Sequence, residues 1–398
     1  MPVNRPLTIL VITYLFLGLV YDQATPTFEA SDEVWHFGVV RELAEGRGLP
    51  VQRPGVLTTY RQEGSQPPGY YAAAAALTFW IDTSDFAQHY VYNPFAQAGV
   101  PGTLVNANMM RHTDAEAFPW TGVTLVVHVL RWFSLLLGVG TILLTHHLAA
   151  LLFPGRASLA LLAAAFTAFN PMFLFISAAV NNDNALWLVS SLAIYLVARA
   201  AQHEITGLRR TRRSVIDWLL SPQRLPWVLG GVLGLAIMVK LSGLVLAPVI
   251  AAFMLWRAWR RRDWPGLVRD AAIVGLCVAV LTGWWFARNV VLYDELLGVR
   301  TMAAIYGLQR AGPVALLELI GEAQGWWYSF WGIFGVFNIL PGLWVYGIYS
   351  GLVLLALIGA VRLLRSSRAG TLQLFGQHAP HLFSLLLLGL TFAANIYW

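Results

Sequence analysis

The sequence predicts an all-α, polytopic membrane protein, and three observations carry that prediction. Of the 398 residues, 58% are hydrophobic and only 12% are charged, whereas a soluble domain has about 25% charged residues. Apolar runs of about the 20 residues that cross a hydrocarbon layer recur along the chain. Arginines gather in short stretches between these runs, as they do in cytoplasmic loops. A soluble domain and a secreted protein with a single signal peptide are therefore excluded.

The apolar runs predict about nine to ten transmembrane helices. The candidate spans are 7–21, 122–152, 158–178, 184–200, 226–241, 243–258, 269–288, 341–361 and 381–398. The first is expected to remain as an uncleaved helix, because no small-x-small cleavage site follows it. A further run at 67–81 is shorter than a normal span. We expect it to lie along the outer interface or to re-enter if Met1 is cytoplasmic, and to cross if Met1 is outside; the first arrangement is favoured.

Basic stretches at 199–224, 257–269 and 362–368 are expected in the cytoplasm. Counting spans outward from them gives a first outer loop at about 22–121 and further outer segments at 181–184, 240–243 and 288–340. The net charge of +6 is thus explained by topology, and no nucleic-acid partner is expected. The single cysteine, Cys277, excludes intramolecular disulfides and cysteine-based metal sites. We expect one transmembrane domain over 1–398, truncated at the C-terminus, because Trp398 ends inside an apolar run.

The segment directly after the first span contains the most informative polar residues. Ser31 is a good N-cap and Gly46 a good stop, and apolar residues recur every fourth position between them. This pattern predicts a short amphipathic juxtamembrane helix lying on the membrane surface. Asp32 and Glu33 fall in its first turn, where the helix dipole favours acids.

Asp32 and His36 are four residues apart and share a helix face, as do Glu33 and His36. One of these carboxylates at the membrane boundary could act as a general base that deprotonates an acceptor hydroxyl. Capping of a surface helix explains the two acids equally well, and a plain interfacial role is favoured for His36 alone.

Further polar motifs fall on the same side of the membrane. Residues 61–71 offer Glu63 and Gln66 beside a rigid Pro-Pro pair. Lys240 lies within or beside a span, and a charge at the centre of a membrane helix costs on the order of 3 kcal/mol, so Lys240 should have a polar or anionic partner. Arg288 precedes Asn289 near another helix end, where arginines often snorkel to the interface.

These motifs resemble those of the integral-membrane glycosyltransferases of the GT-C fold, which include protein O-mannosyltransferases and lipid A aminoarabinose transferases. The resemblance rests on the Asp-Glu pair and nearby His after the first span, and on Gln-Pro-Pro-Gly-Tyr-Tyr at 66–71. Additional matches are at 181–184, 238–242, 284–295 and 329–335. One departure is that Asp294 follows Tyr293 directly, without the intervening glycine of the family pattern.

The resemblance implies a catalytic acid in the first outer loop and a sugar on a polyprenyl phosphate as the donor. We therefore expect an inverting glycosyltransferase of the outer face of a bacterial plasma membrane, with Asp32 and Glu33 as the catalytic residues. The expected substrate-binding residues are His36, Glu63, Gln66, Lys240, Arg288 and Asn289. Cations such as Lys240 and Arg288 would stabilise the phosphate that leaves during transfer.

The partners are less defined. The acceptor could be a protein, a lipid or a glycan. No cofactor is implied with certainty; a divalent metal ion stays open, with Asp32, His36 and Asp183 as candidate ligands whose spacing is not diagnostic. A transporter or lipid flippase is the main alternative, although it would place ionisable residues at mid-bilayer. A non-catalytic membrane scaffold is the third.

Overall fold

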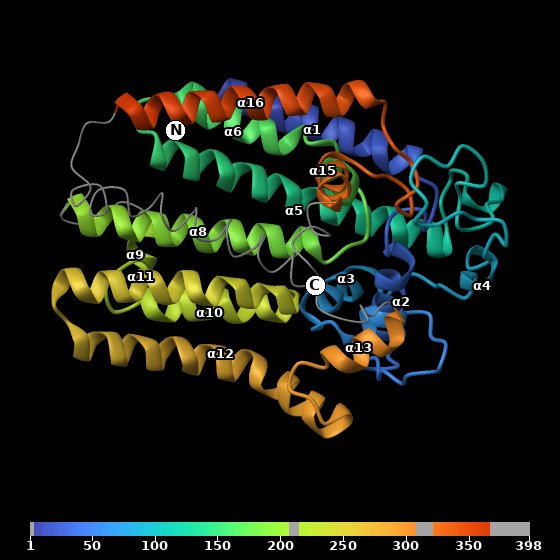
Figure 1. The fold of residues 1–398 in the computed structure, drawn as a ribbon. Helices are drawn as coiled ribbons and strands as arrows, with labels where there is room; N and C mark the ends of the chain where they lie inside the picture. The colour runs from blue at the N-terminus through green and yellow to red at the C-terminus, as the bar shows by residue number, and fades with distance from the viewer. Residues whose placement is uncertain (1–3, 207–214, 308–320, 367–398) are drawn as a thin grey trace.

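The computed structural model describes residues 4–206, 215–307 and 321–366. This part of the chain is helical, as predicted, and its only extended pairings are two isolated bridges, Tyr92 with Met110 and Phe334 with Ile339. The long helices lie side by side in one bundle, and the short helices of the segment 25–121 gather at one end of it (Figure 1).

Five helices of the described part are long and apolar enough to cross a membrane. They are α1 (Arg5–Ala24), α5 (Gly122–Leu152), α8 (Asp183–Thr206), the stretch Leu241–Arg261 that contains η3 (Leu241–Val245) and α11 (Leu246–Arg261), and α12 (Trp264–Tyr293). Two shorter apolar helices are α10 (Leu225–Val239) and the segment Leu343–Gly359 of α16 (Leu343–Ser366). The predicted count of nine to ten spans is therefore not confirmed, and the run 381–398 lies outside the described residues.

The predicted span 158–178 is broken into α6 (Ala157–Ala168) and α7 (Pro171–Ser177), which are bent by 62°. α6 ends at Ala168, and Asn170 caps the start of α7, since its side chain accepts hydrogen bonds from the backbone N–H groups of Met172 and Phe173. Pro171 occupies the first position of α7, where its missing N–H costs nothing. The two pieces together raise the number of candidate spans to six.

The described parts of the basic stretches, in α8, α9 (Val215–Leu219), α11, α12 and α16, lie at the end of the bundle opposite to the segment 25–121 (Figure 1). There Arg257 of α11 binds Glu204 of α8 and Asp270 of α12, at 3.2 Å and 2.9 Å. The helices α8, α10, α11 and α12 also share a core of Leu, Val, Ile and Ala side chains. The bundle thus has one arginine-rich end, and its other end holds the predicted polar motifs.

The segment 25–121 folds into α2 (Glu33–Ala44), η1 (Arg61–Ser65), α3 (Gly69–Thr78), α4 (Phe86–His89) and η2 (Asp114–Glu116). Ten residues of α3 rise only about 15 Å, half of a hydrocarbon layer, so α3 does not cross. Instead its first residue packs against α10: a Cβ on Gly69 would lie 2.6 Å from the Met238 carbonyl oxygen. Only glycine allows this approach.

The surface helix predicted after the first span is corrected by the structure. Seven of the twelve residues of α2 are buried, so the helix is enclosed by its neighbours rather than laid on a membrane surface. Gly38 on α2 approaches the backbone of Thr59 so closely that a Cβ would be 2.5 Å from its carbonyl oxygen. Asp32, not Ser31, holds the N-cap position, and its side chain makes no capping hydrogen bond. The amphipathic pattern was too short to show that both faces of α2 are covered.

The remaining helices are α9 (Val215–Leu219), α13 (Val299–Tyr306) and α15 (Ala323–Trp331). α13 lies beside η1, next to the polar end of the bundle. The link between α15 and α16 returns to the segment 25–121, where the Val336 and Asn338 carbonyl oxygens accept backbone hydrogen bonds from Gly99 and Gly102 at 2.8 Å and 2.9 Å. The segment 25–121 is thereby tied to both halves of the chain.

Candidate functional site

The start of α2 is fixed by a buried ion pair between Glu33 and Arg131 of α5. The Arg131 Nε and Nη2 atoms donate to the two Glu33 carboxylate oxygens at 2.8 Å and 2.7 Å, and both side chains are almost fully buried. The Phe28 and Val180 N–H groups donate to the same carboxylate at 3.1 Å and 3.0 Å. Glu33 therefore joins α2 to α5 and to the loop before α8, and its oxygens are occupied.

Arg131 also fixes the end of α1. Its guanidinium donates to three backbone carbonyl oxygens, those of Asp22, Thr25 and Pro26, at 2.9, 2.7 and 3.0 Å. Because a buried charge must have its hydrogen bonds satisfied, this set of contacts defines where the chain turns from α1 into α2.

Asp32, next to this ion pair, is arranged differently. Its backbone is left-handed, with φ at +58°, and its carboxylate makes no hydrogen bond or ion pair within the described part of the chain. Burial, with the nearby Glu63 carboxylate, raises the pKa of Asp32 to about 6. A carboxylate that is partly exposed, unbonded and more basic than usual suits a general base.

His36, Tyr71 and Glu63 form a buried polar group beside Asp32. The Tyr71 hydroxyl is 2.8 Å from the His36 Nδ1 atom and 3.3 Å from the Glu63 Oε2 atom. Burial is the main cause that raises the pKa of Glu63 to about 7 and lowers the pKa of His36 to about 4. His36 is therefore neutral at pH 7, and Glu63 exchanges its proton near neutrality.

Lys240 lies at the C-terminal end of α10, and its Nζ atom donates to the Asp183 carboxylate at 2.7 Å. The sequence predicted that this lysine would have a polar or anionic partner, and the Asp183 carboxylate is that partner. Both side chains are partly exposed. Burial lowers the pKa of Lys240, but the carboxylates of Asp183, Glu63 and Asp32 raise it by more. The ammonium therefore stays charged. The structure therefore brings Asp32, His36, Glu63, Asp183 and Lys240 into one cluster.

The other predicted substrate-binding residues, Arg288, Asn289 and Gln66, make contacts outside this cluster. Arg288 of α12 donates to the Pro50 carbonyl oxygen at 2.6 Å and lies over the Trp285 ring, while its Nη1 atom is buried without a partner. Asn289 is buried and donates to the Leu296 carbonyl oxygen at 3.3 Å. Gln66 follows η1, and its side-chain oxygen is buried and unbonded. The contacts of these three residues do not include Asp32 or Lys240.

Metal binding was left open for Asp32, His36 and Asp183. Within residues 4–206, 215–307 and 321–366, no group of three or more His, Cys, Asp or Glu side chains is arranged to hold a metal ion. His36 Nδ1 is already engaged with Tyr71, and Asp183 with Lys240. Asp32, His36 and Asp183 are therefore not grouped around a shared ion in the described part of the chain.

Arg131 and Tyr71 belong to this site, although sequence analysis gave neither a role. An arginine within the apolar run 122–152 is costly unless paired, and this could have marked Arg131 as the partner of a buried acid. Asp22, near the end of α1, is likewise a charged residue that needs a partner, and its carboxylate is 2.7 Å from the His128 Nδ1 atom. Tyr71 lies inside the motif 66–71, but a tyrosine there could equally face lipid.

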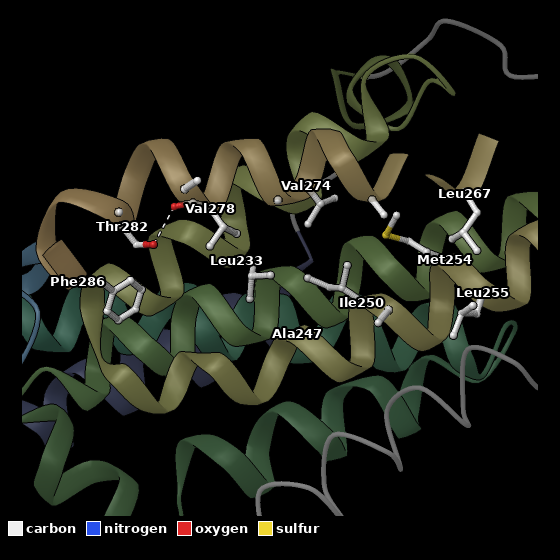
Figure 2. Close-up of a pocket in the computed structure, with 15 residues that line it drawn as sticks. Leu233, Ala247, Ile250, Met254, Leu255, Leu267, Val274, Val278, Thr282 and Phe286 are labelled. Atoms are coloured by element: carbon white, nitrogen blue, oxygen red, sulfur yellow. Dashed lines mark hydrogen bonds between the residues drawn. The ribbon is translucent and has the colours of Figure 1, made fainter. Parts of the chain in front are cut away.

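An apolar groove of about 740 Å³ runs along the bundle between α10, α11 and α12. Figure 2 shows its wall, which includes Leu233, Ile250, Met254, Val278 and Phe286. It ends at Thr282 and Phe286, less than two turns of α12 before Arg288. The groove thus has the lining of a binding site for an aliphatic chain.

Comparisons with known proteins bear on this site. Residues 122–285 match the model of the dolichyl-phosphate-mannose-protein mannosyltransferase family, which agrees with the predicted resemblance to membrane glycosyltransferases. A search of curated proteins found no match. Among solved structures, the protein O-mannosyltransferase Pmt1–Pmt2 complex of S. cerevisiae, bound to the sugar donor, matches with 18% identity and a TM-score of 0.43. The match covers 76% of this chain and 35% of the yeast chain, so the chain spans about a third of that protein's length.

Proposed function

We propose that this protein is an inverting glycosyltransferase that moves a sugar from a polyprenyl phosphate to an acceptor hydroxyl at the outer face of a membrane. The observation that carries the proposal is the cluster at one end of the bundle, in which an unbonded Asp32 carboxylate lies among charged groups that include Lys240. The family match over 122–285 supports the choice of donor class.

In the proposed reaction, Asp32 accepts the proton of the acceptor hydroxyl as its oxygen attacks the anomeric carbon. The bond between that carbon and the phosphate oxygen breaks, and its electron pair leaves with the polyprenyl phosphate. A pKa of about 6 makes Asp32 a stronger base than an exposed carboxylate, while it stays mostly ionised at pH 7.

The leaving phosphate requires positive charge, and Lys240 is the proposed source. A preorganised cation at a developing anion is worth about 3 kcal/mol or more in comparable sites. The Lys240 ammonium binds Asp183, and the phosphate of the donor would share or replace that contact. Arg288 has an unbonded Nη1 atom and is a second proposed cation.

We assign binding roles to the neighbouring groups. His36, Glu63 and Tyr71 would position the sugar or acceptor through hydrogen bonds, with Gln66 and Asn289 contributing at its edges. Glu33, whose oxygens are occupied by Arg131 and two backbone amides, would hold Asp32 in place. The apolar groove beside α12 would take the prenyl chain.

The experiment is a comparison of wild type, Asp32→Asn and Lys240→Ala, with polyprenyl-phosphate mannose as the probe. Binding to the purified protein in detergent and release of free mannose are measured separately. We expect Asp32→Asn to bind normally and to lose at least a hundredfold in turnover, and Lys240→Ala to lose binding. Full turnover by Asp32→Asn would refute the base assignment, and ion-coupled flux in liposomes without turnover would favour the transporter.

A further inference from the structure

A second cavity, of about 660 Å³, lies in the segment 25–121, here called the outer segment, and is polar. It is formed by a hairpin-like stretch in which the Asn93 N–H donates to the Met109 carbonyl oxygen at 2.8 Å and the Arg111 N–H donates to that of Val91 at 2.9 Å. The side chains that give it its chemistry are Asn93, Phe95, Asn106, Asn108, Arg111 and His112. We call it the hairpin pocket.

Several of these side chains are not used by the fold. Arg111, Asn106 and Asn108 are exposed, and none of their side chains makes a hydrogen bond or ion pair in the described part of the chain. Phe95 is 71% exposed, although a large aromatic ring usually finds cover. By contrast, Asn93 supports the hairpin itself, because its amide donates to the Asn108 carbonyl oxygen at 3.0 Å.

The His112 ring at the hairpin pocket is held by two ion pairs. Burial lowers the pKa of His112, but the carboxylates of Glu116 and Glu29 outweigh burial and raise that pKa to about 9. The Nδ1 and Nε2 atoms of the ring lie 2.8 Å and 2.9 Å from the Glu116 and Glu29 carboxylates. The positive charge of His112 is therefore offset by two carboxylates. Among the described side chains that line the pocket, Arg111 is the charged one that makes no hydrogen bond or ion pair.

The hairpin pocket is connected to the proposed catalytic base through Glu29. The Met109 and Met110 N–H groups both donate to the Glu29 carboxylate at 2.7 Å. Glu29 precedes Asp32 by three residues, and three residues span at most about 11 Å. A ligand of several sugar units seated in the pocket could therefore reach Asp32.

The chemistry of the free groups defines a ligand class. Side-chain amides both donate and accept hydrogen bonds, as sugar hydroxyls do, and an exposed aromatic face packs against the apolar face of a sugar ring. An unpaired guanidinium binds a carboxylate through two parallel hydrogen bonds. We propose that the hairpin pocket binds an acidic oligosaccharide and that this glycan is the acceptor, an inference that rests on the proposed transferase function.

The test measures glycan binding to the purified protein in detergent, by calorimetry and by saturation-transfer NMR. The probes are an acidic tetrasaccharide of alternating glucuronate and N-acetylglucosamine, and the neutral tetramer of N-acetylglucosamine. Arg111→Gln and Asn108→Ala remove groups that the fold does not use. Arg53→Gln is the matched control, because Arg53 is an exposed arginine of the same outer segment outside the pocket.

We expect the acidic probe to bind more tightly than the neutral one. Arg111→Gln should weaken binding of the acidic probe at least tenfold and leave the affinity for the neutral probe unchanged. Arg53→Gln should bind as wild type does. Absence of binding by both probes, or equal binding by wild type and Arg111→Gln, would overturn the proposal.

Measuring donor hydrolysis, in which water takes the place of the acceptor, tests the transferase function independently of the acceptor role. Arg111→Gln should hydrolyse polyprenyl-phosphate mannose as wild type does and should lose transfer to the acidic tetrasaccharide. If wild type binds the glycan but neither binds nor hydrolyses any lipid-linked sugar, the transferase proposal fails and the acceptor role fails with it. If the donor is hydrolysed and no glycan binds, only the acceptor proposal fails.

Discussion

Asp32 and Glu33 are neighbours in the chain, yet their carboxylates have opposite environments. Glu33 accepts four hydrogen bonds in a buried ion pair, and Asp32 accepts none within the described residues. Sequence analysis placed both as catalytic because the family resemblance implies a catalytic acid in the first outer loop, where both lie. It could not separate them, because the partner that occupies Glu33 is Arg131, 98 residues away.

The first prediction at this scale concerns pH. Because Asp32 must be ionised to accept a proton and its pKa is about 6, kcat/KM for donor hydrolysis should fall as pH drops below about 6, tenfold for each pH unit. A pH series of initial rates in detergent measures this. A rate that stays constant down to pH 4.5 would show that Asp32 has an ordinary pKa or is not the base.

The second prediction concerns the Glu33–Arg131 ion pair. Glu33→Gln removes the carboxylate that binds the buried Arg131 guanidinium through two hydrogen bonds and leaves the Asp22 carboxylate at 3.6 Å. Removing one partner of a buried ion pair costs about 3 to 5 kcal/mol in comparable pairs. The thermal unfolding midpoint in detergent should drop clearly. Glu42→Gln is the control on the same helix, because its pair with Arg47 is partly exposed and worth about 1 kcal/mol or less. Equal midpoints for the two variants would contradict the structural role of Glu33.

At the scale of elements, the apolar runs located the long helices well. The predicted spans 122–152 and 269–288 correspond to α5 and α12, because length and hydropathy suffice for a straight helix. The break between α6 and α7 was missed, since it depends on the local cap at Asn170. The burial of α2 was missed because it depends on contacts with α3 and η1, which lie elsewhere in the sequence.

A third prediction tests the contact of α3 with α10. Gly69→Ala would place a Cβ 2.6 Å from the Met238 carbonyl oxygen, so α3 must move away from the end of α10. That shift separates Tyr71 and His36 from Lys240, and we expect weaker binding of polyprenyl-phosphate mannose together with a lower unfolding midpoint.

The control for this variant is Gly231→Ala in α10, which has no heavy atom within 4 Å of the new Cβ. It should leave donor binding unchanged and keep or slightly raise the midpoint, because alanine is favoured over glycine in a helix by about 1 kcal/mol. If both variants bind donor as wild type does, the close approach of α3 is not needed by the site.

At the scale of the whole molecule, the sequence predicted the sidedness of the motifs better than their contacts. Asp32, Glu63, Asp183 and Lys240 come from four separate segments and lie together at one end of the bundle, as expected if all are outer residues. Arg288 and Asn289 lie at the same end, but their contacts are with other backbone segments. Sidedness follows from span parity alone, whereas contact requires the packing of side chains.

The fourth prediction tests which end faces outward. In a Cys277→Ser background, Arg53→Cys should react with a membrane-impermeant maleimide on intact cells, and Arg156→Cys should react only after the membrane is opened. Both positions are exposed, and they lie at opposite ends of the bundle. The reverse labelling pattern would place the proposed site in the cytoplasm.

The left-handed backbone of Asp32 has a consequence for how any variant at this position is interpreted. Asparagine and aspartate tolerate φ near +58° better than other residues with a Cβ, which lose roughly 1 kcal/mol or more there. Alanine or glutamate at position 32 would therefore change the loop geometry and the chemistry together, whereas asparagine keeps the geometry. Loss of activity in an alanine scan would measure two effects at once, and the isosteric amide is the substitution that isolates the proton transfer.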